Sequence, residues 1–72
     1  ARTILSSNVL GASCARVCPT EVLCEGACVV LDLEGDPVKI GRLQRHATDH
    51  VYENSIDVLH APATKNGRRV AV

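Results

Sequence analysis

Large side chains are scarce in this sequence. It has no Phe, Trp or Met, and Tyr52 is its single aromatic residue. A chain of 72 residues forms one domain at most, and at this size folding buries only about 60% of the surface that the unfolded chain exposes. The core must be built almost entirely from Val, Leu, Ile and Ala. We therefore expect a metal, a set of disulfides or a larger partner to stabilise it.

Net charge and long apolar runs are also missing. Eight basic and eight acidic residues leave a formal charge of zero, so nothing favours attraction to nucleic acid or to a membrane surface. The longest uninterrupted apolar run, Ala27–Leu31, is far shorter than the ~20 residues that span a bilayer. No charged segment followed by an apolar one, as in a secretory signal, stands at the start. We expect no nucleic-acid or membrane partner and a cytoplasmic location.

The first half of the chain predicts one short helix and a loop. Ala1–Leu10 has apolar residues at helical spacing and is predicted to be the last turns of a helix that begins upstream, with Gly11 ending it. Ser13–Val29 contains all four cysteines. Pro19 and Gly26 interrupt this segment, which predicts a winding loop with about one helical turn.

The second half predicts one amphipathic helix. Leu31–Pro37 is polar and typical of a turn. Asp36 is placed to cap a helix over Pro37–Glu53, with the proline at the first helical position. An apolar stripe at spacings of three and four supports this helix; its residues are Ile40, Leu43, Ala47 and Val51.

The last part of the chain predicts little regular structure. Asn54–Gly67 contains Pro62 among small and polar residues and is typical of a linker. Residues 68–72 read Arg-Arg-Val-Ala-Val, which predicts the start of a β-strand.

The strongest chemical signal is the pattern Cys14-x3-Cys18-Pro19-x4-Cys24-x3-Cys28. Clustered thiolates favour iron-sulfur clusters, zinc or copper(I), and a cysteine followed by proline is common in the cluster-binding runs of bacterial ferredoxins. Two disulfides are an alternative, although nothing indicates an oxidising compartment. A zinc-stabilised interaction module without redox activity is another, although the two cysteine pairs lie close together for one tetrahedral site.

A family resemblance favours the iron-sulfur interpretation. Gly11–Val29 followed by Pro37–Arg45 resembles the N-terminal cluster domain of the dihydropyrimidine dehydrogenase and glutamate synthase small-chain family, and the similarity covers roughly Asn8–His50. The strings Cys-Pro-Thr-Glu-Val-Leu-Cys and Leu-Gln-Arg-His-Ala-Thr-Asp are most similar to the bacterial NAD-dependent dihydropyrimidine dehydrogenase small subunit. The resemblance implies a mostly α fold, that is, a small helical iron-sulfur domain with long loops, truncated at both ends.

The resemblance also implies the site residues. Cys18 and Cys24 correspond to two ligands of one 4Fe-4S cluster, Gln44 corresponds to its non-cysteine ligand, and Cys28 corresponds to a ligand of a second cluster. Cys14 falls where the family has no ligand, so we expect a packed thiol beside the site. The upstream cysteines that complete both clusters in the family are absent from this sequence. The clusters would therefore be completed by residues outside this chain.

The same resemblance implies a domain division and a function. Residues 1–60 would be the C-terminal half of a helical 4Fe-4S domain, and residues 61–72 the linker and first strand of a truncated flavin-binding domain. The function implied is electron transfer in an oxidoreductase whose remaining parts bind FAD and NAD(P)H. The rest of that flavoprotein and a second redox subunit or domain would be the partners. No nucleophile with its base and no phosphate loop can be assembled, so we expect no catalysis by this segment alone.

Charged residues near the cysteines would adjust a cluster's potential. Lys39, Arg42 and Arg45 would stabilise the reduced, more negative state, whereas Glu21 and Glu25 would oppose it. A solvated polar face is the alternative for the three basic residues.

Two histidines offer a further metal hypothesis. His46 and His50 share a helical face with Asp49 nearby, which would suit a zinc site completed by cysteines. Solvated side chains are the alternative. Gln44 would likewise be a solvated amide on sequence grounds alone.

Overall fold

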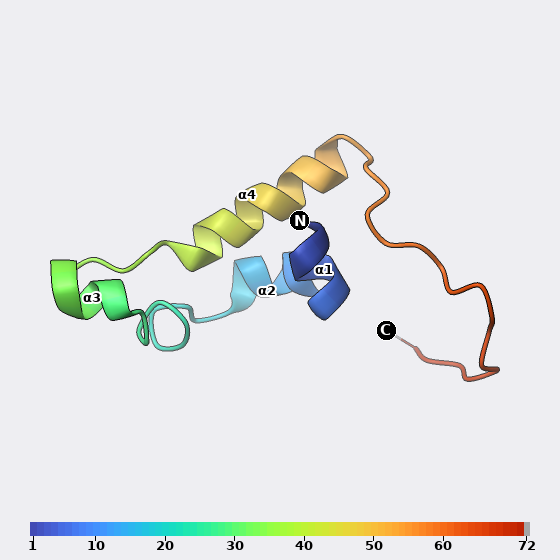
Figure 1. The fold of residues 1–72 in the computed structure, drawn as a ribbon, viewed down its shortest axis with the longest axis horizontal. Helices are drawn as coiled ribbons and strands as arrows, with labels where there is room; N and C mark the ends of the chain where they lie inside the picture. Colours follow the sequence, from blue (N-terminus) through green and yellow to red (C-terminus); the bar gives the residue numbers. More distant parts are fainter. Residues whose placement is uncertain (72) are drawn as a thin grey trace.

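All the regular secondary structure in the described residues is α-helical. The computed structural model describes residues 1–71, and its elements are α1 (Arg2–Ser7), α2 (Gly11–Val17), α3 (Val29–Glu34) and α4 (Ile40–Glu53). No β-strand occurs within the residues described. The predicted mostly α class is therefore confirmed. Figure 1 shows α3 at one end of the molecule and the segment after α4 extending from the other.

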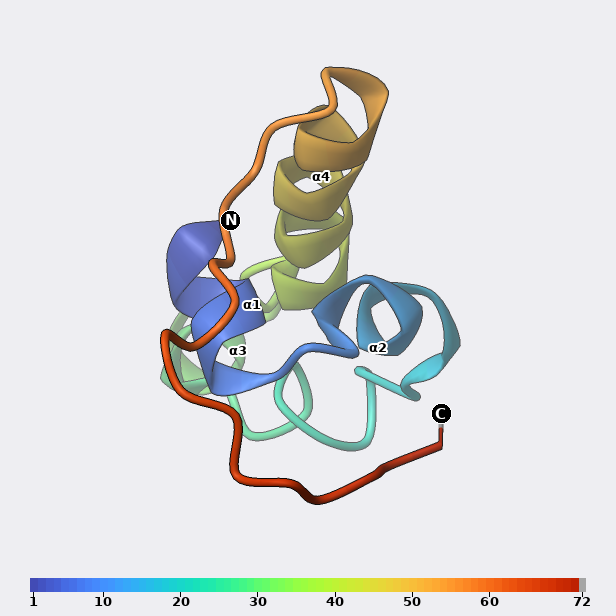
Figure 2. The same ribbon diagram turned by 90° about the vertical axis from the view of Figure 1, so that its right-hand side faces the viewer.

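The packed part of the molecule is built around α4. Helix α2 packs against α4, and α1 packs against α2 (Figures 1 and 2). Leu5 and Val51 are the buried apolar side chains, at 4% and 6% exposure. Thr48 is fully buried, and its hydroxyl donates hydrogen bonds to the carbonyl oxygens of Gln44 (2.9 Å) and Arg45 (3.1 Å) in its own helix. The apolar core is therefore as small as the composition predicts.

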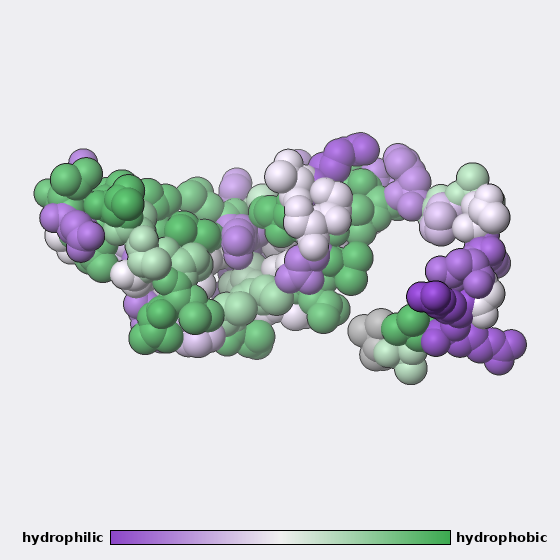
Figure 3. Space-filling view, turned by 60° about the horizontal axis from the view of Figure 1, so that its bottom comes forward, coloured by the Kyte–Doolittle hydropathy of each residue, from purple (hydrophilic) through white to green (hydrophobic). Residues whose placement is uncertain are grey.

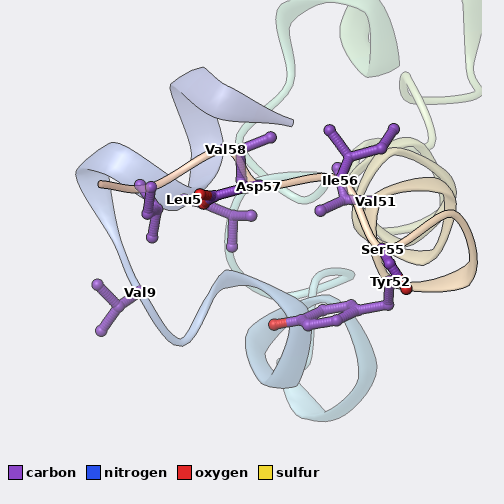
Figure 4. Close-up of a pocket in the computed structure, with 9 residues that line it drawn as sticks. Leu5, Val9, Val51, Tyr52, Ser55, Ile56, Asp57 and Val58 are labelled. Atoms are coloured by element: carbon purple, nitrogen blue, oxygen red, sulfur yellow. The ribbon is translucent and has the colours of Figure 1, made fainter. Parts of the chain in front are cut away.

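An apolar groove lies beside this core. Leu5 and Val51 line an open cavity of about 320 Å³ together with Ile56 and Val58 from the segment after α4. Figure 4 shows these side chains converging from α1, α4 and that segment, with Tyr52 at one side. The chain after α4 thus covers part of the core without forming a helix.

The prediction that Gly11 ends a helix is wrong. Helix α1 ends at Ser7, and Gly11 is the first residue of α2. The side chain of Asn8 makes the turn between them, because its Oδ1 accepts the backbone N–H of Leu10 at 3.0 Å. Gly11 is needed for a different reason: a Cβ there would lie 2.7 Å from Cγ2 of Ile4, so glycine lets the two helices approach.

The segment between Ser13 and Pro37 is more helical than predicted. Helix α2 continues through Val17, inside the stretch that was predicted to be a loop. Helix α3 extends to Glu34, and its residues from Leu31 onward lie in the stretch that was predicted to be a turn. Only the end of that segment turns as predicted. Gly35 adopts the left-handed conformation (φ 76°) and its N–H bonds the carbonyl of Leu31 at 2.9 Å, which ends α3.

Helix α4 starts later than predicted. It begins at Ile40, so Asp36 does not cap it and Pro37 is not its first residue. Asp36 instead forms an ion pair with Nζ of Lys39 at 2.6 Å. The physical reason is that the free N–H groups at the start of α4 obtain an acceptor from a distant part of the chain. The helix ends at Glu53, as predicted.

The buried face of α4 also differs from the predicted stripe. Val51 is buried, but Leu43 is 59% exposed, and the other buried positions are Gly41 and Thr48. A Cβ at Gly41 would lie 3.0 Å from Cγ2 of Thr20. The close approach of the preceding loop therefore requires a small residue at Gly41. Of the predicted stripe, Val51 is buried, Ile40 and Ala47 are half-buried, and only Leu43 is exposed.

The chain after α4 has no regular secondary structure up to residue 71, as the linker prediction requires for Asn54–Gly67. No strand is formed over residues 68–71, and Val72 lies outside the described residues. The predicted strand and the domain division at residue 60 stay predictions. No helix within residues 1–71 has the length and apolar character needed to cross a lipid bilayer.

Candidate metal centre

The loop that joins α2 to α3, called the cysteine loop below (Cys18–Cys28), is wound around one carbonyl group. The oxygen of Thr20 accepts the backbone N–H groups of Leu23 (3.2 Å), Glu25 (2.8 Å) and Gly26 (3.3 Å). Since one acceptor binds three donors, the loop folds back on itself into a tight coil. The thiols on this loop are thereby held on a defined backbone.

Gly26 is the residue that permits this coil. A Cβ at this position would lie 2.4 Å from the carbonyl oxygen of Glu21 and 3.3 Å from the carbonyl carbon of Val22. These are backbone atoms, which cannot rotate away. The glycine is therefore required by a close approach of the chain to itself.

A carboxylate connects the cysteine loop to α4. Oε1 of Glu25 accepts the backbone N–H of Gly41 at 2.9 Å in a partly buried contact. Gly41 is the second residue of α4, and its N–H has no partner inside the helix. A negative charge at this end of a helix is favoured by the helix dipole.

The first three cysteines lie near one another. All four thiols are free, with Cys18 and Cys24 exposed and Cys14 half-buried. Desolvation, followed by the neighbouring thiols of Cys14 and Cys24, raises the pKa of the Cys18 thiol. Nδ2 of Asn8 lies 3.2 Å from Sγ of Cys14. Cys14 is therefore a hydrogen-bonded thiol beside Cys18.

Cys28 lies in a different environment. It is half-buried and precedes the first residue of α3. Hydrogen bonding from the backbone N–H of Val38, and then from that of Val30, lowers the pKa of the Cys28 thiol against the opposing effect of desolvation. The thiolate form, which is the form that binds metals, is therefore favoured at this residue.

Basic side chains surround Cys18. An open cavity of about 310 Å³ has Cys18 and Glu25 on its wall together with the predicted basic residues and Arg16. The predicted residues are Lys39, Arg42 and Arg45. Neither Gln44 nor the thiols of Cys24 and Cys28 line this cavity. Gln44 is half-buried on α4, one turn after Gly41.

Two of these cations are paired with Asp49. Its carboxylate bonds Nη2 of Arg16 in α2 and lies 3.4 Å from Nε of Arg45 in α4. Nη1 of Arg16 also donates to the carbonyl oxygen of Ala12 at 2.9 Å. Hydrogen bonding from Arg16 lowers the pKa of the Asp49 carboxyl. This network joins the helix before the cysteine loop to the helix after it.

The two histidines are placed as solvated side chains. His46 and His50 are both exposed on α4, and Nδ1 of His50 lies 3.4 Å from Nδ2 of Asn54. Asp49, which a zinc site would need, is bound to Arg16 instead.

The donors suit a 4Fe-4S cluster in kind. Free thiols on a coiled loop are soft ligands of the type that iron-sulfur clusters use. No group of three or more His, Cys, Asp or Glu side chains within residues 1–71 is arranged to hold a metal ion. This part of the chain thus provides suitable donors and not a complete coordination shell.

The family assignment rests on comparison with known proteins. A family model described as dihydropyrimidine dehydrogenase domain II, 4Fe-4S cluster, matches residues 1–56. The chain belongs to this family. The resemblance inferred from the cysteine pattern and the helical iron-sulfur class are both confirmed.

The relatives are subunits of oxidoreductases. The chain is 44% identical, over all 72 residues, to the NAD-dependent dihydropyrimidine dehydrogenase subunit PreT of Escherichia coli (strain K12), and 42% identical to the PreT homolog of Salmonella typhi. It is 36% identical over 59 residues, 82% of the chain, to a putative glutamate synthase (NADPH) small chain of Cereibacter sphaeroides. The chain spans 17% of the length of the first two and 14% of the third. No solved structure is significantly similar to it.

Sequence reasoning missed the contacts that connect the elements. The bond from Gly41 to Glu25 spans 16 residues, and the ion pair between Arg16 and Asp49 spans 33. No local pattern specifies such partners. One signal was available: a glycine near the start of a helix, as at Gly41, often marks a close approach of another backbone or side chain.

Proposed function

We propose that this domain conducts electrons within a larger flavin-dependent NAD(P)H oxidoreductase and that its thiols bind 4Fe-4S clusters. The match of residues 1–56 to a 4Fe-4S domain family carries this proposal. The printed names of the relatives, a dihydropyrimidine dehydrogenase subunit and a glutamate synthase small chain, support the class of parent enzyme. FAD and NAD(P)H would bind in the rest of the parent protein, and a second redox subunit or domain would exchange electrons with it. The four free thiols suit a cytoplasmic location.

The proposed ligands come from two parts of the chain, the cysteine loop and α4. Cys18 and Cys24 would bind one cluster together with Gln44, and Cys28 would bind the other, with the remaining ligands provided by residues outside this chain. Such a cluster, when bound, accepts and donates single electrons without forming or breaking bonds in a substrate. An amide ligand in place of a thiolate would change the charge of the site by one unit.

The protein's own residues would adjust this electron transfer. Carboxylates pair Arg16, Lys39 and Arg45, whereas Arg42 forms no ion pair within residues 1–71. Arg42 would therefore place positive charge beside Cys18, which stabilises a more reduced state and raises the potential. The backbone N–H groups directed at the Cys28 thiol favour its thiolate form. The tight coil of the cysteine loop orders the thiols before any metal binds.

Anaerobic reconstitution tests the proposal. The full-length protein, prepared without oxygen and incubated with iron and sulfide, should become brown and contain iron and acid-labile sulfide in equal amounts. A colourless protein holding one zinc would favour the zinc-stabilised interaction module instead. A protein that binds neither would contradict both.

A further inference from the structure

The proposed ligands of the first cluster lie on separate parts of the chain. Cys24 belongs to the cysteine loop, whereas Gln44 lies in the second turn of α4. Between them the chain passes through α3, which stands at the far end of the molecule (Figure 1). A cluster held by both residues requires a defined distance between loop and helix. The connecting chain alone does not set that distance, so a direct contact must.

A hydrogen bond between Glu25 and Gly41 provides such a contact. Glu25 follows Cys24 directly, and its Oε1 accepts the N–H of Gly41 at 2.9 Å. Gly41 precedes Gln44 by three residues, which places both on one face of α4. The hydrogen bond therefore joins the neighbour of one proposed ligand to the helical turn before the other.

Helix α4 depends on this carboxylate because its own sequence provides no substitute. Lys39, at the N-cap position, makes no side-chain cap, and the first turn of α4 contains no acidic residue. Asp36, the residue that the sequence suggested as the cap, is bound to Lys39. The acceptor at the start of the helix thus comes from the cysteine loop.

The surrounding geometry fixes the contact on both sides. A Cβ at Gly41 would lie 3.0 Å from Cγ2 of Thr20 and 3.5 Å from Oε1 of Glu25. The carbonyl of Thr20 accepts the N–H of Glu25 at 2.8 Å. Thr20 therefore touches the helix and orients the glutamate at the same time. Glu25 and Cys18 also line the same cavity.

We infer that Glu25 is a positioning residue, whose carboxylate fastens the cysteine loop to α4 and sets the position of Cys24 relative to Gln44. This inference rests on the proposed function, because it concerns ligands of the proposed cluster. The charge of Glu25 has a separate effect, because a negative charge beside the site lowers the reduction potential of the cluster. The hydrogen bond to Gly41 sets the distance between the cysteine loop and α4.

Three substitutions of Glu25 separate the effect of side-chain length from the effect of side-chain charge. E25Q keeps the length of the side chain and an oxygen that accepts the N–H of Gly41. E25D keeps the charge but is one methylene shorter and cannot make the same contact. E25A removes both. Glu21 offers the matched control, because it carries the same charge on the same loop, is exposed, and its side chain forms no hydrogen bond or ion pair with residues 1–71.

The first readout is amide hydrogen exchange in the full-length, anaerobically prepared protein. E25A and E25D should accelerate exchange at Gly41 about fivefold to tenfold, as expected for loss of a helix cap. E25Q should change it little, and E21A should leave it at the wild-type rate. Wild-type exchange at Gly41 in E25A would overturn the inference.

The second readout is the reduced cluster itself. E25A and E25D should alter its electron paramagnetic resonance signal. E25Q and E21Q should both keep the wild-type signal, and each should raise the midpoint potential because it removes one negative charge. An E25D signal identical to that of wild type would also overturn the inference. Absence of iron and sulfide from the wild-type protein would end the proposed function, and exchange at Gly41 would then decide whether the fastening contact exists.

Discussion

The two ends of this molecule are held together in different ways. Around α2 and α4 the structure relies on buried side chains, with Leu5, Thr48 and Val51 inside and an ion pair from Arg16 to Asp49 across the helices. The cysteine loop relies on backbone hydrogen bonds, three of which go to the carbonyl group of Thr20. The buried side chains stabilise the packed helices by removing apolar surface from water. The hydrogen bonds of the cysteine loop fix the conformation of its backbone without burying apolar surface.

Apolar side chains are exposed in both parts, for example Val17 in α2 at 78%, but no residue of the cysteine loop or α3 is buried. In the cysteine loop and α3, Val22, Val29 and Leu33 are exposed by 71%, 72% and 82%. Figure 3 shows apolar surface gathered over this end of the molecule. Such a surface is typical of a region that another part of the protein or a metal site covers. The comparison teaches that the loop end has a defined conformation and lacks a core of its own.

The largest effect is expected from breaking the packed end. Leu5→Ala should lower the free energy of unfolding by about 2–5 kcal/mol, since it empties a buried site between α1 and the rest. Leu33→Ala removes the same atoms from an exposed site on α3 and should cost no more than about 0.5 kcal/mol in the unpartnered domain. Denaturant unfolding, monitored by hydrogen exchange, measures the loss of unfolding free energy in both variants. Equal costs would contradict the division between the two ends.

A smaller effect is expected from opening the cysteine loop. Gly26→Ala places a methyl group against the carbonyl of Glu21, and the loop should lose about 1–3 kcal/mol of local stability. Exchange should accelerate at the amides that bond Thr20, with little change in α2. Gly35→Ala is the control: its Cβ meets no atom within 4 Å, so only the left-handed conformation is strained, at about 1 kcal/mol and within α3. Faster exchange throughout α2 and α4 in Gly26→Ala would show that the ends are not independent.

The smallest effect is expected from the ion pair between α2 and α4. The pKa of Asp49 is lower in the folded state, because Arg16 bonds its carboxylate. Its contribution to stability is therefore present above the carboxyl pKa of the unfolded chain and is lost as the pH falls through the lower, folded value. The free energy of unfolding of the wild-type protein should fall as Asp49 becomes protonated at acidic pH. Asp49→Asn should lack this fall when the free energy of unfolding is measured as a function of pH. Glu53→Gln, at an exposed site on the same helix, should keep the fall, and its loss there would assign the titration to another group.

Local patterns predicted the end of the long helix and the irregular chain beyond it, and long-range contacts explain what they missed. The end of α4 at Glu53 and the irregular chain beyond it follow from spacing and composition. The start of α4 does not, because Glu25, 16 residues earlier, provides the acceptor. Helix α3 was missed because none of its residues is buried, so no periodic buried face marks it.

The candidate site divides in the same way. The cysteine cluster is evident from its spacing, whereas the roles of Cys18, Cys24 and Cys28 as cluster ligands come from the resemblance and stay a proposal. Gln44 is identified only by resemblance, since an amide on a helix carries no signal of its own. The groups that position these residues, Glu25 and its partner Gly41, depend on the folded chain.

The most direct test of the account compares two cysteines of the same pattern. Cys24→Ala in the full-length protein should lose the iron and sulfide of one cluster, because it removes a proposed ligand. Cys14→Ala should keep the wild-type content, because the proposal makes Cys14 a hydrogen-bonded neighbour of Cys18 and assigns it no cluster. Wild-type iron and sulfide in Cys24→Ala, or their loss in Cys14→Ala alone, would contradict the assignment.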